Sequence, residues 1–357
     1  LSCCFGTMLL PFSVSLNNHL PAAAATAATM WLYLAAIERR RRAESASDAN
    51  ESGRNVSHGR TIRVIGWLAG VCASFAAANE LPALSMMGLW AILFAALDRR
   101  TILPFVAGVA LVAIGFFGTN WAAHQSLRPA YAHRGNGALI AQLDSSALEA
   151  QAVIPEARQA LDREGLAPSD SIKVSPSDEV SRWVVEADEQ RFALLRSEPG
   201  GWKLRYWDDW YEYPGTYWKD GVRRGVDRGE ASRRVYFLHM TVGHYGLFSL
   251  TPIWCLVPVG FFGAIVLRWP IGSDLGTEPE RPPADGAGSA ERRMLWAILL
   301  ATLVCLLFYL GRPVIDRNYG GVSVCFRWML WFAPMWLWVA SASIEAFSSR
   351  PSLRWLF

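Results

Sequence analysis

Residues 101–118 read TILPFVAGVALVAIGFFG and contain no charged side chain. A helix that crosses the hydrocarbon core of a bilayer needs about 20 mostly apolar residues, so this stretch is long enough to form one span. Similar apolar runs cover residues 20–37, 64–79, 81–97, 245–267, 294–311 and 322–344, and residues 1–16 look like the surviving end of another. The pattern predicts a mainly α-helical, polytopic transmembrane bundle of about eight spans.

The composition of the 357-residue chain excludes several other classes of protein. Hydrophobic residues make up 52% and charged residues only 18%, whereas soluble domains carry about 25% charged residues. This argues against a plain soluble enzyme and against a disordered chain. The net charge of +3, with no basic stripe, predicts no nucleic-acid partner. The six cysteines lie in apolar runs and lack metal-ligand spacing, so we expect neither a disulfide framework nor a zinc site.

Arginine in the short connections predicts the orientation of the chain. Fifteen arginines lie in residues 38–63, 98–100, 268–293 and 345–357. The alternate connections hold only Arg312 and Arg317. Because short cytoplasmic loops carry an excess of Lys and Arg, we expect the first set inside and the second set outside, in a bacterial plasma membrane.

The same alternation divides the chain into three parts. Residues 1–118 would hold the first five membrane helices, and residues 245–357 the last three, with a cytoplasmic linker near 268–293. The polar block 119–244 between them would be extracytoplasmic. Within it, 144–164 has helical composition, and 183–187, 191–196 and 202–207 alternate like three strands of a meander. We therefore predict a small α+β subdomain.

Polar and titratable residues gather in the connections predicted to lie outside. If the helices bundle, these turns crowd onto one surface, where a membrane-embedded active site is expected. The candidates for an acceptor-binding or structural polar cluster are Asn18, His19, Asn120, His124, His133, His244 and Asp316. Helix capping is the favoured alternative for Asn17 and Asn18.

Arginine supplies the candidates for phosphate binding. Arg224 and Arg228 lie in the Arg- and Gly-rich run 223–234. The alternative interpretation of this run is a solvent-exposed surface without a ligand. Arginine binds phosphate through two parallel hydrogen bonds, and glycine lets backbone N–H groups approach the oxygens. Arg327 lies about five residues inside the predicted last span, where a charge is costly and indicates function unless it snorkels to a lipid headgroup. With Arg317 it could grip the phosphate of a lipid-linked donor.

Two phrases and the architecture resemble the GT-C class of membrane glycosyltransferases, which includes protein mannosyltransferases and RgtA/B/C/D-like bacterial enzymes. The phrases are SLNNHLP at 15–21 and DRNYGG at 316–321. The resemblance covers the membrane part and implies transfer of a sugar from a polyprenyl-phosphate donor to a lipid, glycan or protein acceptor.

The resemblance also implies a catalytic Asp or Glu in the first outer loop. This chain starts after that point, with Leu1 inside an apolar run, so we expect a missing upstream portion and no residue here matches the family's acid. Glu80 or Asp227 would serve instead, as the base that accepts the acceptor's proton.

Other functions fit the same sequence. An O-antigen ligase or polymerase would use similar chemistry, whereas a transporter or lipid flippase would need charges at mid-membrane. A non-catalytic membrane protein with an outer binding domain is a third alternative. No cofactor is predicted with certainty, and a divalent metal ion stays open, as does the oligomeric state. The lipid bilayer and the polyprenyl-phosphate donor are the expected partners.

Overall fold

The chain divides into two compact units in the computed structural model, which describes residues 7–9, 17–47, 54–166, 172–197, 200–219, 221–269, 287–320 and 325–348. The helical unit comprises Leu1–Phe116, Ser232–Gly311 and Tyr319–Phe357, and the sheet unit comprises Phe117–Ala231 and Arg312–Asn318. Residues 232–244 therefore pack with the helices, and 312–318 with the sheet. The division predicted from the sequence puts 232–244 in the polar block 119–244 and puts 312–318 in the segment 245–357.

Five helices of the described chain are long and apolar enough to cross a membrane. They are His19–Ala43 within α3 (His19–Ser47), Gly59–Asn79 within α4 (Arg54–Asn79), Arg99–His124 (η1, Arg99–Thr101, and α6, Ile102–His124), Ser289–Gly311 within α11 (Ala287–Gly311), and Arg327–Ser348 (η7, Arg327–Phe332, and α12, Ala333–Ser348). Two shorter apolar helices are α5 (Ala83–Leu97) and Pro252–Ile265. The prediction of a mainly helical chain with apolar spans and a small sheet is confirmed. The count of eight spans and their orientation stay predictions.

The run 245–267 differs from the single span predicted for it. It forms three pieces, α9 (Leu247–Leu250), η5 (Pro252–Cys255) and α10 (Leu256–Ile265). Pro252 lacks a backbone N–H and starts a new helix, and Thr251 before it has non-helical torsions of φ −138° and ψ 78°. Of the predicted run 1–16, only residues 7–9 are described, and 270–286 of the predicted linker also lies outside the described residues.

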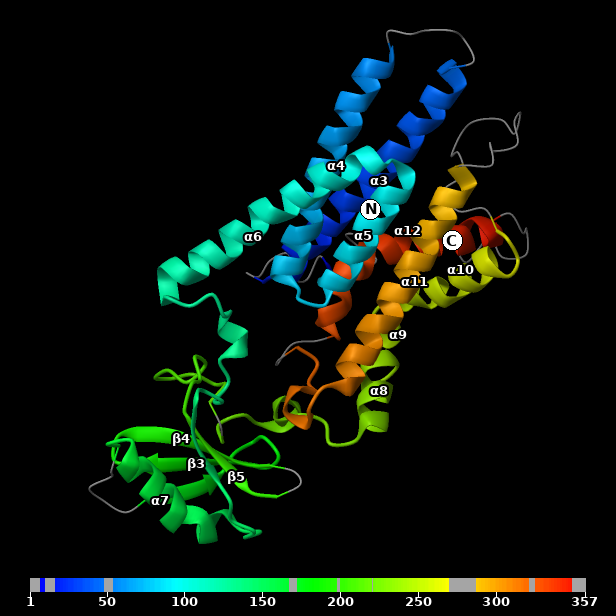
Figure 1. Ribbon diagram of the computed structural model, residues 1–357. Helices are drawn as coiled ribbons and strands as arrows, with labels where there is room; N and C mark the ends of the chain where they lie inside the picture. The colour runs from blue at the N-terminus through cyan, green and yellow to red at the C-terminus, as the bar shows by residue number, and fades with distance from the viewer. Residues whose placement is uncertain are drawn as a thin grey trace. The chain divides into compact units, whose positions relative to one another are not determined.

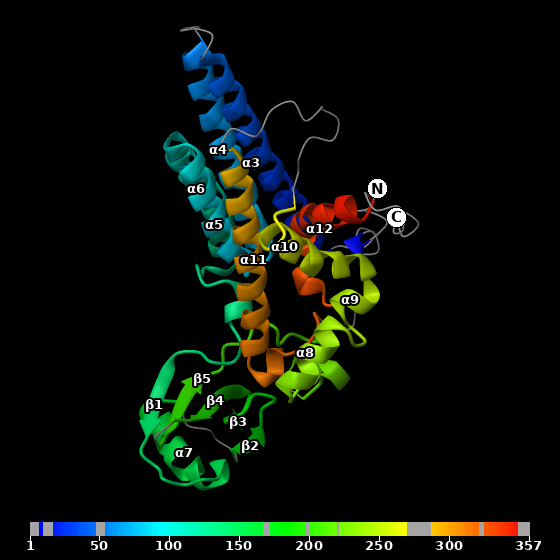
Figure 2. The same ribbon diagram turned by 90° about the vertical axis from the view of Figure 1, so that its right-hand side faces the viewer.

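The helical unit is built around α3. Helices α3 and α4 run side by side in both ribbon views (Figures 1 and 2). The Tyr33 ring of α3 contacts Trp90 and Phe94 of α5, with ring centroids 5.6 and 5.2 Å apart. The buried positions of α5 recur every three or four residues, which is the spacing of one helix face; they include Met86, Trp90, Leu93 and Phe94. A buried apolar and aromatic core therefore joins α3 and α5.

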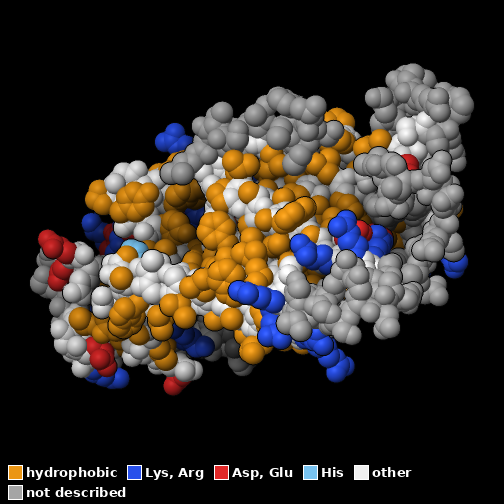
Figure 3. All heavy atoms as spheres, turned by 90° about the horizontal axis from the view of Figure 1, so that it is seen from above, with side chains coloured by type: hydrophobic (Ala, Val, Ile, Leu, Met, Phe, Trp, Pro, Cys, Tyr) orange, Lys and Arg blue, Asp and Glu red, His pale blue; other side chains and the backbone are white. Residues whose placement is uncertain are grey.

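Much of the outer surface of the helical unit is apolar. Within the span Arg99–His124 only 17% of the most apolar window is buried, and Leu103 and Ile114 are 79% and 72% exposed. Figure 3 shows broad areas of hydrophobic side chains on the described part of the molecule. Such extensive apolar surface is costly in water but suits contact with lipid.

The sheet unit contains five antiparallel strands in the order β1-β5-β4-β3-β2 (Figure 2). The strands are β1 (Leu139–Leu143), β2 (Lys173–Pro176), β3 (Arg182–Ala187), β4 (Gln190–Arg196) and β5 (Trp202–Tyr206). The predicted meander corresponds to β3–β5. Helix α7 (Ile154–Arg163), preceded by the turn η3 (Ala150–Val153), starts later than predicted and packs through Ala157 and Leu161 against sheet residues such as Phe192 and Leu204.

Glycines allow α4 and α6 to approach closely. A Cβ atom at Gly70 would lie 2.1 Å from the carbonyl oxygen of Phe105, and one at Gly108 would lie 2.3 Å from that of Trp67. Both distances are far inside van der Waals contact, so backbone packs on backbone here. A Cβ at Gly115, two turns further along α6, would have no atom within 4 Å.

We expect Gly108→Ala to destabilise the protein, because the helix backbones must separate to admit the methyl group, at a cost of about 1–3 kcal/mol. Gly115→Ala is the matched control on the same helix and should be neutral or stabilising by up to about 1 kcal/mol, since alanine favours helix. Thermal unfolding in detergent micelles measures both. Equal melting temperatures for the two variants would show that the α4–α6 contact is not tight.

Candidate functional site

Glu80 lies in the tight turn where α4 ends and α5 begins. Its N–H donates to the Ala76 carbonyl (2.8 Å), and its own carbonyl accepts from the Ala83 N–H (2.8 Å). Pro82 follows, just before the first residue of α5. The turn therefore fixes the Glu80 backbone on both sides and holds its side chain against the start of α3.

The start of α3 supplies two partners for this carboxylate. Asn17 caps the helix, because its Oδ1 accepts from the backbone N–H groups of His19 (3.0 Å) and Leu20 (3.1 Å). The Asn18 amide instead donates to the Asn79 carbonyl (2.7 Å) and to Glu80 Oε1 (2.9 Å). His19 Nδ1 pairs with the same Glu80 oxygen in a short hydrogen bond. The predicted cap is thus Asn17, whereas Asn18 and His19 bind Glu80.

Burial sets the proton affinity of this group. The side chains of His19 and Glu80 are only 4% and 6% exposed. Burial raises the pKa of Glu80 above its ordinary value of 4.5, and the hydrogen bond and charge of His19, followed by the charge of Arg327, oppose the rise. A carboxylate with a raised pKa, held by an imidazole, takes up a proton more readily than an ordinary carboxylate, as a general base must.

Arg327 acts on Glu80 through its charge. It is the first residue of η7, which packs against α3, so it begins the last span and does not lie five residues inside it as predicted. Gly320 has a φ of +100°, and a Cβ there would lie 2.6 Å from both Cγ and Nε of Arg327. The glycine therefore makes room for the Arg327 side chain against the backbone.

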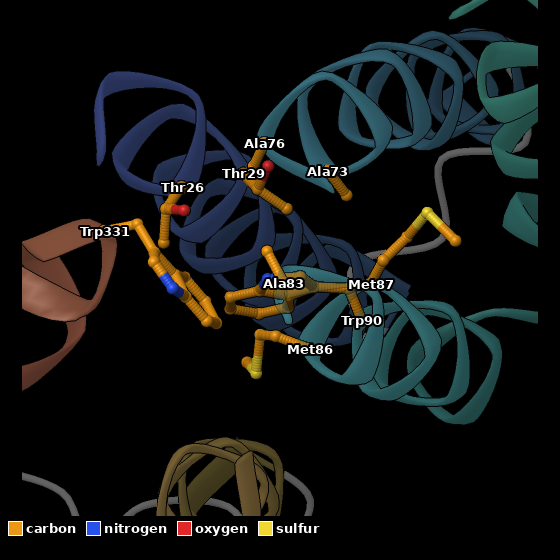
Figure 4. A pocket seen from close by; sticks show the side chains of 9 residues that line it. All are labelled: Thr26, Thr29, Ala73, Ala76, Ala83, Met86, Met87, Trp90 and Trp331. Carbon is orange, nitrogen blue, oxygen red and sulfur yellow. The ribbon is translucent and has the colours of Figure 1, made fainter. Parts of the chain in front are cut away.

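A small hollow lies beside the Glu80 turn within the helical unit. Figure 4 shows Trp331 of η7 pointing into it, toward residues of α3 and α5. Its lining is Thr26, Thr29, Ala73, Ala76, Ala83, Met86, Met87, Trp90 and Trp331. Ala76 and Ala83 are each within one turn of Glu80, so this mostly apolar surround contributes to the low-dielectric setting of the carboxylate.

His244 belongs to an aromatic group elsewhere in the helical unit. Its ring is exposed and stacks on His239, with centroids 5.9 Å apart. His239 lies edge-on to Tyr319 (6.3 Å), which in turn stacks on Tyr245 (4.3 Å). Tyr319 immediately precedes Gly320, so this group is joined by the chain to the backbone that adjoins Arg327.

Asp316 and Arg317, by contrast, make their contacts inside the sheet unit. Asp316 accepts from Arg134 Nη1 (2.7 Å) and from Arg312 Nη2 (2.5 Å). Arg317 donates to the carbonyls of Arg312 (2.8 Å), Ala231 (2.9 Å) and Glu230 (3.3 Å) and is 7% exposed. With its guanidinium committed to backbone carbonyls, Arg317 fixes the 312–318 segment, and this geometry does not favour a phosphate role.

Asp227, Arg224 and Arg228 surround the short turn η4 (Gly225–Arg228). Asp227 is 2% exposed, and its Oδ2 accepts from the Tyr217 hydroxyl (2.8 Å). The Tyr217 oxygen also accepts from the Arg224 N–H (3.2 Å), so the pair closes the turn. Arg224 and Arg228 expose their side chains, and Arg228 Nε donates to the Arg223 carbonyl (2.9 Å). Asp227 thus has a structural role in the turn η4. Glu80 differs from it because its polar partners are Asn18 and His19.

The other predicted polar residues close the C-terminal end of α6. Asn120 donates to the carbonyls of Ser126 and Arg128, both at 2.8 Å. His133 pairs with Asp208 (2.7 Å) and stacks on Trp210 at 3.7 Å, and His124 contacts the same indole at 4.6 Å. The sequence did not indicate Asp208 as a partner of His133, because the two residues lie 75 positions apart.

The described part of the chain holds no group of three or more His, Cys, Asp and Glu side chains arranged for a metal ion. Comparison with protein-family models, with curated proteins and with solved structures found no match to this chain. The site is therefore defined by its own geometry, which gathers Asn18, His19 and Glu80 from three helix ends and adds the charge of Arg327 from a fourth.

The raised pKa of Glu80 predicts a pH dependence of stability. Between pH 4.5 and the raised pKa the folded chain keeps the Glu80 proton and the unfolded chain loses it, so the free energy of unfolding falls as the pH rises across this window and levels off above it. We expect Glu80→Gln to remove this part of the slope. Thermal unfolding across the acidic and neutral range measures it, with the exposed Glu149→Gln as control. Parallel curves for wild type and Glu80→Gln would contradict the assignment.

Proposed function

We propose that the protein is a GT-C-like membrane glycosyltransferase, which moves a sugar from a polyprenyl-phosphate donor to a lipid, glycan or protein acceptor on the outer face of the plasma membrane. The observation that carries the proposal is the buried Glu80–His19 pair with the charge of Arg327 acting on it. A base and a cation beside membrane spans are the two groups that such a transfer requires.

The proposed chemistry is a single displacement at the anomeric carbon. The acceptor hydroxyl oxygen forms the new bond to that carbon, and its proton passes to the Glu80 carboxylate. The bond between the anomeric carbon and the donor phosphate oxygen breaks, and the electron pair leaves with the polyprenyl phosphate. Arg327 stabilises the negative charge of the departing phosphate, and His19 and Asn18 hold Glu80 in position.

The position of the charges supports an enzyme over a transporter. Glu80 directly follows the span Gly59–Asn79, and Arg327 is the first residue of the span Arg327–Ser348. Both groups therefore lie at helix ends, and in the proposed arrangement these ends are at the depth of lipid headgroups, where the donor phosphate is bound. A transporter of charged substrates would favour such groups near mid-membrane.

The test separates binding from transfer. We expect Arg327→Ala to weaken binding of polyprenyl phosphate to the purified protein about tenfold or more, since a charge-assisted hydrogen bond contributes about 1.5–3 kcal/mol. Glu80→Gln should retain binding but abolish transfer, measured as loss of a surface glycan by mass spectrometry of cells that carry the variant.

Matched controls are available on α7, where Glu156→Gln and Arg163→Ala change residues of the same types on the sheet unit. Asp227→Asn tests the alternative base and should retain transfer wherever the variant folds. Wild-type glycan in Glu80→Gln cells, or unchanged polyprenyl-phosphate binding by Arg327→Ala, would overturn the proposal.

A further inference from the structure

Helix α8 (Arg233–Thr241) has two apolar faces, and only one of them is packed. Tyr236 and Met240, one turn apart, are fully buried. On the other side, Val235 and Leu238, together with Val242 directly after the helix, follow helical spacing and are 38%, 52% and 56% exposed. Phe237 between the two faces is 48% exposed. An exposed apolar stripe on a short helix needs a partner other than water.

Ring contacts locate α8 beside the end of a membrane span. Tyr236 packs edge-on against Phe326 (6.3 Å), and Phe326 packs edge-on against Tyr309 in the last turn of α11 (5.2 Å). Helix α8 also packs against α11 itself. The helix therefore lies at the level where α11 ends, at Gly311.

The surface of α11 at this level has the character of a membrane boundary. Leu303, Leu307 and Phe308 are 48%, 67% and 40% exposed, as expected of side chains that face lipid. Tyr309 stacks on Trp328 at 4.9 Å, and Tyr and Trp concentrate at the interface between hydrocarbon and water. The exposed stripe of α8 thus belongs to a helix that packs against the end of α11, whose exposed side chains are also apolar.

The charges of α8 fit the same boundary. Arg233 and Arg234 are both exposed and occupy the first turn of the helix, which Ser232 caps by accepting from the Val235 N–H (3.4 Å). Arginine at the edge of an apolar face reaches the phosphates of lipid headgroups while its stem covers hydrocarbon. Apolar side chains on one face and cations beside them are the pattern of a helix that lies in the plane of a membrane.

We propose that α8 is an interfacial helix that inserts Val235, Leu238 and Val242 into the leaflet at the Gly311 end of α11, with Arg233 and Arg234 on its headgroup phosphates. The occupant of the exposed face is the lipid surface itself. The inference depends on membrane insertion of α11 and goes beyond the proposed transfer reaction, so it stands or fails separately from it.

The test uses the full chain in lipid nanodiscs with the photo-crosslinker benzoylphenylalanine at position 238. Ultraviolet light should produce lipid adducts, detected by mass spectrometry, at position 238 and at the lipid-facing position 307. Position 180, where Val180 of the sheet unit is 76% exposed, should give none. The same substitution at position 242 provides a second reporter if the first variant does not fold.

The charges are tested in the same system. Arg233→Glu with Arg234→Glu should lower the yield of adducts at position 238 in nanodiscs that contain phosphatidylglycerol, and the corresponding double lysine variant should keep it. Absence of lipid adducts at positions 238 and 242 while position 307 gives them would overturn the proposal. A protein cross-link at position 238 in place of a lipid adduct would do the same and would identify a protein partner.

Discussion

The burial of one carboxylate constrains the centre of the helical unit. Glu80 follows α4 and precedes α5; it accepts a hydrogen bond from the Asn18 amide and pairs with His19 at the start of α3. A buried acid is costly unless its oxygens are satisfied, so α3, α4 and α5 must keep their ends together. Because η7 and α12 also pack against α3, the position of Arg327 depends on the same junction. The groups that give the site its chemistry also determine how the helices meet.

Hydropathy predicts most of the helices because a spanning helix must be apolar along its whole length, whether a side chain packs inside the protein or faces lipid. It also predicts that Asn18, His19 and Glu80 share one surface, since α4 must return the chain to the side on which α3 begins; it does not predict their hydrogen bonds. It did not predict the break at Thr251–Pro252, because hydropathy measures length and polarity but not backbone torsions. Hydropathy also does not locate the first residue of a helix to within a few positions. Arg327 was therefore predicted five residues inside the last span, whereas it is the first residue of η7.

Long-range pairing sets the limit of the sequence argument. DRNYGG at 316–321 reads as one motif, yet Asp316 and Arg317 belong to the sheet unit and Tyr319 and Gly320 to the helical unit. Asp316 pairs with Arg134, which is 182 residues away, and no local sequence pattern predicts such a partner. The edge strands were missed for a related reason: β2 is four residues long and mostly exposed, so it lacks the alternation that made β3–β5 recognisable.

The sheet unit is assembled from two pieces of chain, 117–231 and 312–318, which Asp316 and Arg317 join through Arg134 and the carbonyls of Glu230 and Ala231. During synthesis the ribosome makes residues 232–311 between these pieces. The larger piece therefore emerges early but lacks the Arg134–Asp316 ion pair and the hydrogen bonds from Arg317 until α8 to α11 have followed it. The contacts between the two pieces can therefore form only after the ribosome has also made residues 232–311.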